Sequence, residues 1–112
     1  MSLPSQALVE RFLEALWIED GLAANTLAAY RRDLTAYATW LAGEQGHAIE
    51  STREGDLLAY TAYRHAGSRA TSANRRLTVF KRFFRWALRE HVVAADPALR
   101  LRNAKQPLRV PK

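Results

Sequence analysis

The sequence predicts an all-α fold in which four helices form one domain. Four stretches carry apolar residues at intervals of three and four, which is the spacing of one helix face. The chain of 112 residues is 48% hydrophobic, which is enough for one packed core but too short for two domains. It has no cysteine, so packing alone must hold the fold. We expect residues 1–102 to form this domain and the proline-containing residues 103–112 to be an extended linker to a further domain.

The first helix is expected from about Ser5 to Asp20, where Gly21 ends it. Its apolar stripe contains Leu8, Val9, Phe12, Leu13 and Leu16. The other face is acidic and carries Glu10, Glu14, Glu19 and Asp20. Because carboxylates repel phosphates, we interpret this helix as a scaffold that stays away from any polyanion.

The second helix is expected over residues 24–43. Its apolar face contains Leu27, Tyr30, Leu34, Tyr37, Ala38 and Leu41. Asn25 and Thr26 lie in its first turn, and Arg31 and Arg32 follow. Free N–H groups at a helix start, together with short polar side chains, suit a phosphate group. Ordinary capping by Asn25 or Thr26 explains the same residues, and both interpretations stay open.

The third helix is expected from Ser51 or Thr52 to about Gly67. Its inner positions are expected to be Leu57, Leu58, Thr61 and Ala62. Its charge is mixed, and we assign it no functional role.

The fourth helix, expected over residues 69–90, is the element around which the others are arranged. Its apolar arc contains Ala73, Leu77, Phe80, Phe84, Ala87 and Leu88, and is widened by Val79, Phe83 and Trp86. An arc this wide predicts a helix packed on two sides. The opposite face carries Arg75, Arg82, Arg85 and Arg89, with Lys81 at its edge. If these arginines lie on the surface, removing Arg75 or Arg82 should change stability by no more than about 0.5 kcal/mol.

Charge is distributed unevenly along the chain. Residues 69–112 hold twelve Lys and Arg against two acidic residues, a net charge of +10, whereas residues 1–68 hold five basic and nine acidic residues, a net charge of −4. This asymmetry indicates a polyanion bound mainly by the second half. A solvated helix face is the alternative, but the arginines lie in register along one face, which favours nucleic acid.

The sequence contains no motif for catalysis or for metal binding. His47, His65 and His91 stand apart and lack the pairing typical of a zinc site. There is no Gly-rich phosphate loop and no Ser, His and Asp set, so we expect no catalytic residue, no cofactor and no metal. No run approaches the roughly 20 apolar residues of a membrane span, and no signal peptide is recognised, which predicts a cytoplasmic protein.

The segments LAANTLAAYRRDLTAYATWL and ATSANRRLTVFKRFFRWALRE are followed by a DPA turn and the tail KQPLRVPK. Together they resemble the N-terminal core-binding domain of bacterial tyrosine recombinases of the Xer subfamily, over nearly all of residues 6–112. The resemblance implies a four-helix, SAM-like domain that closes over duplex DNA opposite a catalytic domain. The nucleophilic tyrosine and its helpers would lie in that second domain, outside this chain. The parent would be a site-specific recombinase that needs neither metal nor ATP, exchanges strands within a tetramer and resolves chromosome dimers at cell division.

The resemblance also implies DNA contacts at individual positions. Thr26, Tyr30, Arg31 and Arg32 match the family's second-helix motif, and Thr71, Ser72, Arg75, Arg76 and Arg82 match the DNA-facing part of its fourth helix. Ala23 departs from the pattern, because the family often has a serine cap there. With their polar and charged neighbours, the expected DNA contacts are Asn25, Thr26, Tyr30, Arg31, Arg32, Arg69, Thr71, Ser72, Arg75, Arg76, Lys81, Arg82, Arg85 and Lys105.

Two other functions are compatible with the sequence. A small helix-turn-helix regulator is favoured by the tight connection at Gly67 and Ser68 before a basic helix. The length and wide apolar arc of the fourth helix speak against a recognition helix. A helical adaptor that binds an acidic protein through its arginines is the other alternative. An ionic-strength series against duplex DNA and against an acidic peptide would separate these functions.

Overall fold

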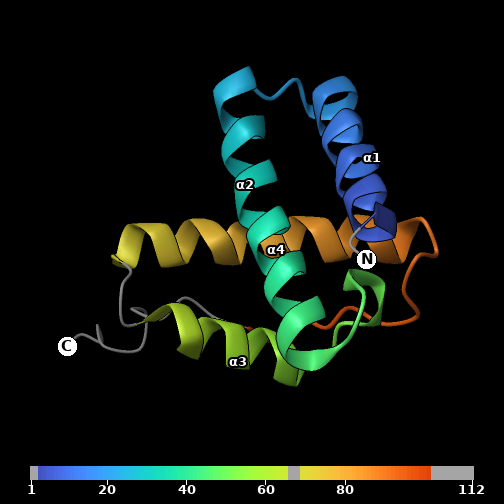
Figure 1. Cartoon of the computed structure of the whole chain (residues 1–112). Helices are drawn as coiled ribbons and strands as arrows, with labels where there is room; N and C mark the ends of the chain where they lie inside the picture. The colour runs from blue at the N-terminus through green and yellow to red at the C-terminus, as the bar shows by residue number, and fades with distance from the viewer. Residues whose placement is uncertain (1–2, 66–68, 102–112) are drawn as a thin grey trace.

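A computed structural model describes residues 3–65 and 69–101 of the chain (Figure 1). Within these ranges the four helices are α1 (Leu3–Asp20), α2 (Ala24–Trp40), α3 (Glu54–His65) and α4 (Ala70–Arg89). A π-helical turn, Leu41–Gln45, continues α2, and a 3-10 turn, Ile49–Ser51, precedes α3. The expectation of an all-α fold with four helices is confirmed. The linker expected over residues 103–112 lies outside the described residues.

The helices are arranged around α4 (Figure 1). Helices α1 and α2 form an antiparallel hairpin, joined by a short turn in which Gly21 has a φ of +64°. That left-handed conformation favours glycine, which explains why α1 ends there. Helix α4 passes behind this hairpin at a steep angle, and α3 lies below α4 (Figure 1). None of the described helices is long and apolar enough to cross a membrane.

The core forms because α4 is packed on two sides, as its wide apolar arc predicts. On one side Phe83 packs edge-on against Phe12 of α1, with ring centroids 5.2 Å apart. On the other side Phe80 lies 5.1 Å from Tyr37 of α2, whose ring in turn contacts Tyr60 of α3 at 5.1 Å. Edge-to-face and tilted aromatic pairs of this kind stabilise a core beyond the area they bury. All four helices therefore contribute an aromatic ring to one connected core.

Some inner positions differ from those expected. Leu88 is 40% exposed, whereas Val79 and Phe83 are fully buried. The buried face of α4 therefore includes Phe83, which was expected only at its edge, and excludes Leu88. On α3, Leu58 is 53% exposed, and Thr61 and Ala62 are also exposed. The inward-facing residues of α3 are Asp56, Leu57 and Tyr60.

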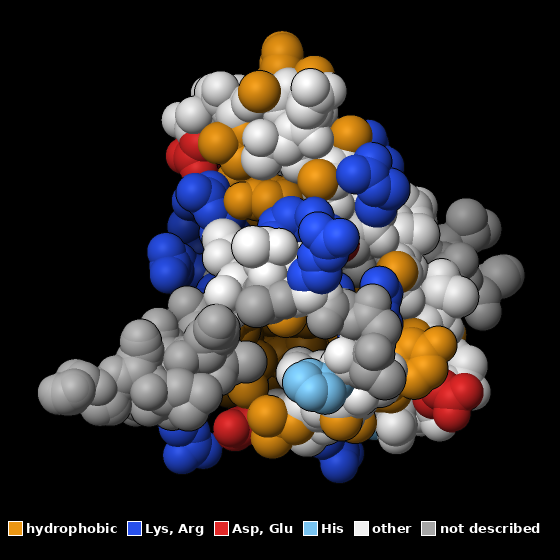
Figure 2. Space-filling model, turned by 90° about the vertical axis from the view of Figure 1, so that its left-hand side faces the viewer, with side chains coloured by type: hydrophobic (Ala, Val, Ile, Leu, Met, Phe, Trp, Pro, Cys, Tyr) orange, Lys and Arg blue, Asp and Glu red, His pale blue; other side chains and the backbone are white. Residues whose placement is uncertain are grey.

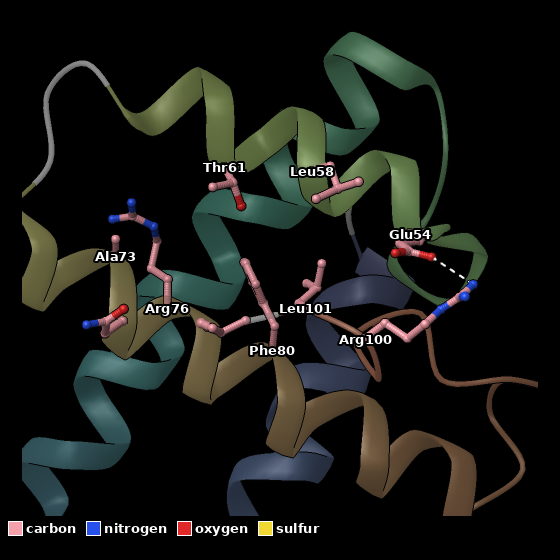
Figure 3. A pocket seen from close by; sticks show the side chains of 10 residues that line it. Glu54, Leu58, Thr61, Ala73, Arg76, Phe80, Arg100 and Leu101 are labelled. Atoms are coloured by element: carbon pink, nitrogen blue, oxygen red, sulfur yellow. Dashed lines mark ion pairs between the residues drawn. The ribbon is translucent and has the colours of Figure 1, made fainter. Parts of the chain in front are cut away.

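The chain after α4 returns to α3 and covers one end of the core. Lys81 Nζ donates hydrogen bonds to the carbonyl oxygens of Ala98, at 2.9 Å, and Leu99, at 3.3 Å. Figure 3 shows the hollow between α3 and α4 at this place, where Arg100 forms an ion pair with Glu54 at 3.5 Å. Lys81, an expected DNA contact, therefore also holds this segment in place.

The C-terminal end of α4 is closed by a Schellman motif. His91 N donates to the Leu88 carbonyl at 3.1 Å, and Val92 N donates to the Ala87 carbonyl at 2.8 Å. This geometry requires His91 to adopt a φ of 62°, a conformation that costs a residue with a Cβ atom about 1 kcal/mol or more.

Replacing this residue by glycine should stabilise the domain. We expect His91→Gly to raise the free energy of unfolding by about 0.5–1 kcal/mol, because glycine adopts the left-handed conformation without the steric cost. Urea unfolding followed by circular dichroism would measure this difference. Glu90→Gly is the matched control, because Glu90 has a φ of −89° and should gain nothing. An equal or lower stability for His91→Gly than for the parent would contradict the assignment of strain to this position.

Candidate nucleic-acid interface

Helices α2 and α4 both begin without a side-chain cap. The N-cap residues are Ala23, with φ −67° and ψ 154°, and Arg69, with φ −85° and ψ 158°. The first helical hydrogen bonds join Leu27 N to the Ala23 carbonyl and Ala73 N to the Arg69 carbonyl, each at 3.0 Å. The N–H groups that precede these donors have no partner within the helix, so they remain for an anion or for water. Capping by Asn25 or Thr26, the alternative for the start of α2, is not observed, because the N-cap residue is Ala23 and no side chain caps the helix.

Polar side chains accompany both uncapped starts. In α2, Asn25 is exposed and Thr26 half-buried. In α4, Thr71 is exposed and Ser72 half-buried. Both starts thus combine N–H groups that have no partner within their helix with nearby hydroxyl or amide groups.

A basic hollow lies where α2, α3 and α4 meet. Its lining residues are Arg31, Arg32, Asp33, Thr35, Ala36, Arg64 and Arg75. Four arginines and one acidic residue, Asp33, thus line the hollow, which leaves an excess of positive charge among its lining residues. Figure 2 looks at the end of the molecule where α4 begins, and Lys and Arg side chains gather across the middle of this face. Such a concave positive surface attracts polyanions.

Asp33 holds Arg75 in a fixed orientation. Arg75 Nε donates to Asp33 Oδ2 at 2.8 Å, and Nη2 donates to Oδ1 at 3.0 Å, so the pair is bidentate. The Asp33 side chain is only 9% exposed, whereas that of Arg75 is 43% exposed. These hydrogen bonds raise the pKa of Arg75 above its ordinary value. Two of the five N–H groups of the guanidinium face Asp33, and the remaining three can contact a phosphate.

Helix α1 also contributes to the charge pattern. Glu10 accepts hydrogen bonds from Arg31 Nε at 2.9 Å and from Nη2 at 2.8 Å, with both side chains 46% exposed. The hydrogen bonds from Arg31 lower the pKa of the Glu10 carboxyl. Arg32, the next residue, is exposed and has no ion-pair partner among the described residues. Arg32 is therefore a cation of the hollow that an incoming phosphate can reach without displacing a carboxylate.

Two arginines in the second half of α4 form ion pairs with acidic residues of α1. The sequence alone did not indicate these pairs. Arg82 pairs with Asp20, and Arg89 pairs with Glu19, in each case at 3.3 Å. The acidic end of α1 thus lies against α4, beside these arginines. The expectation that α1 stays away from a polyanion remains a prediction. Ion pairs this exposed contribute about 0–1 kcal/mol and exchange readily. Arg85 is exposed and has no ion-pair partner in the part of the chain that the structure describes.

Two expected contacts are buried, and one lies outside the described residues. Tyr30 is 8% exposed and belongs to the core, and Arg76 is 5% exposed. In Figure 3, Arg76 extends from α4 toward α3. Burial, followed by repulsion from Arg64, lowers the pKa of Arg76. Both side chains have little surface left for DNA, and nothing is described of Lys105.

Arg64 was not among the residues expected from the sequence, because α3 was assigned no role. Arg64 Nη1 donates to the Tyr60 hydroxyl at 2.9 Å, and its guanidinium lies 5.8 Å from the centre of the Tyr60 ring. The spacing of four residues between the two side chains is the one available signal, because such pairs meet on a helix surface.

Arg75 is exposed, as expected, but its pairing with Asp33 changes the expected effect of removing it. We expect Arg75→Ala to lower the free energy of unfolding by about 1–3 kcal/mol, because Asp33 would stay buried without its partner. Arg32→Ala, the matched exposed arginine, should stay within about 0.5 kcal/mol of the parent. Urea melts of the two variants measure both values. If the double variant Asp33→Ala, Arg75→Ala is destabilised by the full sum of the single changes, the two residues do not act as a pair.

Comparison with known proteins agrees with this arrangement. Residues 9–91 match the family described as phage integrase, N-terminal SAM-like domain. The chain is 63% identical over 108 residues to the tyrosine recombinase XerD of Ralstonia nicotianae, covering 96% of this chain and 35% of that protein. It is 41% identical over 109 residues to XerD of Proteus mirabilis, covering 96% and 34%, and 39% identical over 113 residues to XerD of Yersinia pestis, covering 100% and 38%.

The match supports the resemblance stated from the motifs. These relatives are all named XerD. The segment FLEALWIEDGLAANTLAAYRRDL likewise resembles the XerD branch of the Xer subfamily more than the XerC branch. The chain spans about a third of the length of these relatives. The four-helix arrangement and the matched residues together assign the fold. This chain belongs to the phage integrase N-terminal SAM-like domain family.

Proposed function

We propose that this domain binds duplex DNA at the recombination site of a site-specific tyrosine recombinase. The observation that carries the proposal is the basic hollow, which lies between the two helices that begin without a cap. Both features suit the phosphate backbone and neither depends on base sequence. We infer that the domain contributes affinity mainly through phosphates.

The two helices offer the same pair of groups to a DNA strand. On α2, Asn25 and Arg32 are seven residues apart, so they lie on one side of the helix about 10 Å from each other. On α4, Ser72 and Arg75 are three residues apart and share a face in the same way. Each helix start would hold one phosphate with its N–H groups, and the following arginine would hold another. The orientation of Arg75 fixed by Asp33 reduces the entropy lost on binding.

The cutting and joining of strands would belong to the part of the relatives that this chain does not match. Tyr37 illustrates the reason, because burial raises the pKa of its hydroxyl and an activated nucleophile needs the opposite shift. Its hydroxyl bonds to Thr52 Oγ1 at 2.9 Å inside the core. The full-length enzyme would act in the cytoplasm, in a DNA-bound tetramer with a second recombinase protomer, and resolve chromosome dimers at cell division.

The chemistry proposed for the parent needs neither a metal nor a cofactor. Among residues 3–65 and 69–101, no three His, Cys, Asp or Glu side chains gather as ligands for a metal ion.

The helix-turn-helix alternative is less suitable. Its recognition helix would be α4, and α4 buries Val79, Phe80, Phe83 and Phe84 between the other helices.

Salt dependence tests the proposal directly. Fluorescence anisotropy with a labelled duplex should show binding whose log–log dependence on salt falls by about 0.9 for each phosphate neutralised. Arg32→Ala should weaken binding several-fold and make this slope shallower by about 1, because one phosphate contact is lost.

The control is Arg53→Ala, which removes the same charge from an exposed arginine that does not line the basic hollow. It should change both the affinity and the slope much less than Arg32→Ala does. An affinity independent of salt, or equal losses in the two variants, would contradict phosphate binding in the hollow. Tighter binding to an acidic peptide than to duplex DNA would favour the adaptor instead.

A further inference from the structure

A second hollow lies beside the basic hollow, and it is lined by aromatic rings. Its lining residues are Ala36, Thr39, Trp40, Gly43, Glu44, Tyr60, Tyr63 and Arg64. The rings of Trp40 and Tyr63 have centroids 5.9 Å apart and an interplanar angle of 31°. Tyr63 is 63% exposed, and Trp40 is half-buried. We call the surface formed by Trp40 and Tyr63 the aromatic shelf.

The aromatic shelf is the outer end of a stack that begins in the core. Tyr37 and Tyr60 are at most 1% exposed. Trp40 stacks on Tyr37 at 6.1 Å and 27°, and Tyr63 lies 6.0 Å from Tyr60 at 33°. The buried rings of Tyr37 and Tyr60 therefore hold the two outer rings in place, although Tyr63, the more exposed of the two, contributes little to the core. A fixed and exposed ring is a preorganised stacking surface.

The aromatic shelf is continuous with the basic hollow. Ala36 and Arg64 line both hollows. Arg64 is fixed at this border by its hydrogen bond to Tyr60, at 2.9 Å. In Figure 2, exposed hydrophobic side chains lie just below the group of Lys and Arg side chains. A positive groove beside exposed aromatic rings is the arrangement by which proteins bind single-stranded nucleic acid.

Charge decides which part of a nucleotide would occupy the shelf. Glu44 is the acidic residue among the lining residues of the shelf, and it is exposed. A carboxylate there disfavours a phosphate, whereas the neutral face of a base meets no such repulsion. The basic hollow next to it offers the phosphate of the same strand four arginines. The two hollows thus suit the two ends of a nucleotide.

We propose that the aromatic shelf stacks an unpaired base of a DNA strand whose phosphates lie in the basic hollow. The proposal rests on the DNA binding proposed above and extends it to a second DNA form. Bases within a duplex have both faces covered by their neighbours, so the shelf would bind only where pairing is lost. Strand exchange between two duplexes requires bases to leave their partners, and it therefore supplies such a base.

The experiment compares three DNA forms by fluorescence anisotropy at one salt concentration. They are an intact duplex, the same duplex with a short single-stranded gap, and a gap whose nucleotides are abasic. We expect the protein to bind the gapped form at least about fivefold more tightly than the duplex, in line with the stacking of one base. The abasic gap has the same phosphates and the same flexibility but no base, so it should lose this preference.

Variants of the exposed ring assign the preference to the aromatic shelf. Tyr63→Ala should abolish the preference for the gapped form while leaving duplex affinity unchanged, and Tyr63→Phe should retain it. Leu58→Ala is the matched control, because Leu58 lies on the same helix, is 53% exposed and lines no part of the shelf. Thermal melts would establish that all three variants fold.

The outcomes separate the two proposals. Duplex binding without a preference for the gapped form, or a preference that Tyr63→Ala retains, would overturn the shelf proposal alone. An equal preference for the abasic gap would overturn it as well, because flexibility and not stacking would be its cause. Displacement of gapped DNA by a proline-rich peptide at equal concentration would assign the shelf to a peptide instead. Failure to bind any DNA form would overturn the proposed function and this extension together.

Discussion

The fold depends on burying α4 from two directions. Phe83 packs on Phe12 of α1, and Phe80 packs on Tyr37 of α2 and near Tyr60 of α3, so one helix joins all the others. With a domain this small, and without disulfides, these aromatic contacts carry a large share of the stability. Because most of the circumference of α4 is used in this way, its exposed arginines are confined to a narrow strip.

This confinement sets the positions of the charged groups. Arg75 leaves α4 next to α2 and meets Asp33, whereas Arg82 and Arg89 leave it next to α1 and meet Asp20 and Glu19. Each carboxylate reduces the repulsion among neighbouring arginines, which would otherwise oppose the packing of the helices. The cost is that part of the positive face is already paired before any polyanion arrives. The basic hollow also has two paired arginines, Arg31 with Glu10 and Arg75 with Asp33, but its four guanidinium groups still leave it an excess of positive charge.

The sequence predicted what depends on one helix and missed what depends on two. Apolar spacing located all four helices and the two-sided packing of α4, because it is a property of each helix alone. It placed Leu88 inside and gave Arg75 no partner, because apolar spacing within one helix does not show where neighbouring helices lie. Asp33 is 42 residues from Arg75 in the chain, and no local pattern joins them. The weaker cap of α2 was indicated by Ala23, whereas Arg64 and the aromatic shelf required the position of α3.

Three ion-paired arginines of α4 therefore fall into two groups with different energetics of binding. Arg75 is held by a nearly buried carboxylate in bidentate geometry, so it keeps this partner when it contacts a phosphate. Arg82 and Arg89 are held by carboxylates that are about half exposed, at 3.3 Å, and a phosphate can replace these partners. Contacts of the first kind favour affinity because an arginine that is already fixed loses little conformational entropy on binding. Contacts of the second kind add little net free energy, because one ion pair is exchanged for another. Affinity should therefore be concentrated at the basic hollow, and the remainder of α4 should adjust to the DNA that the hollow has already bound.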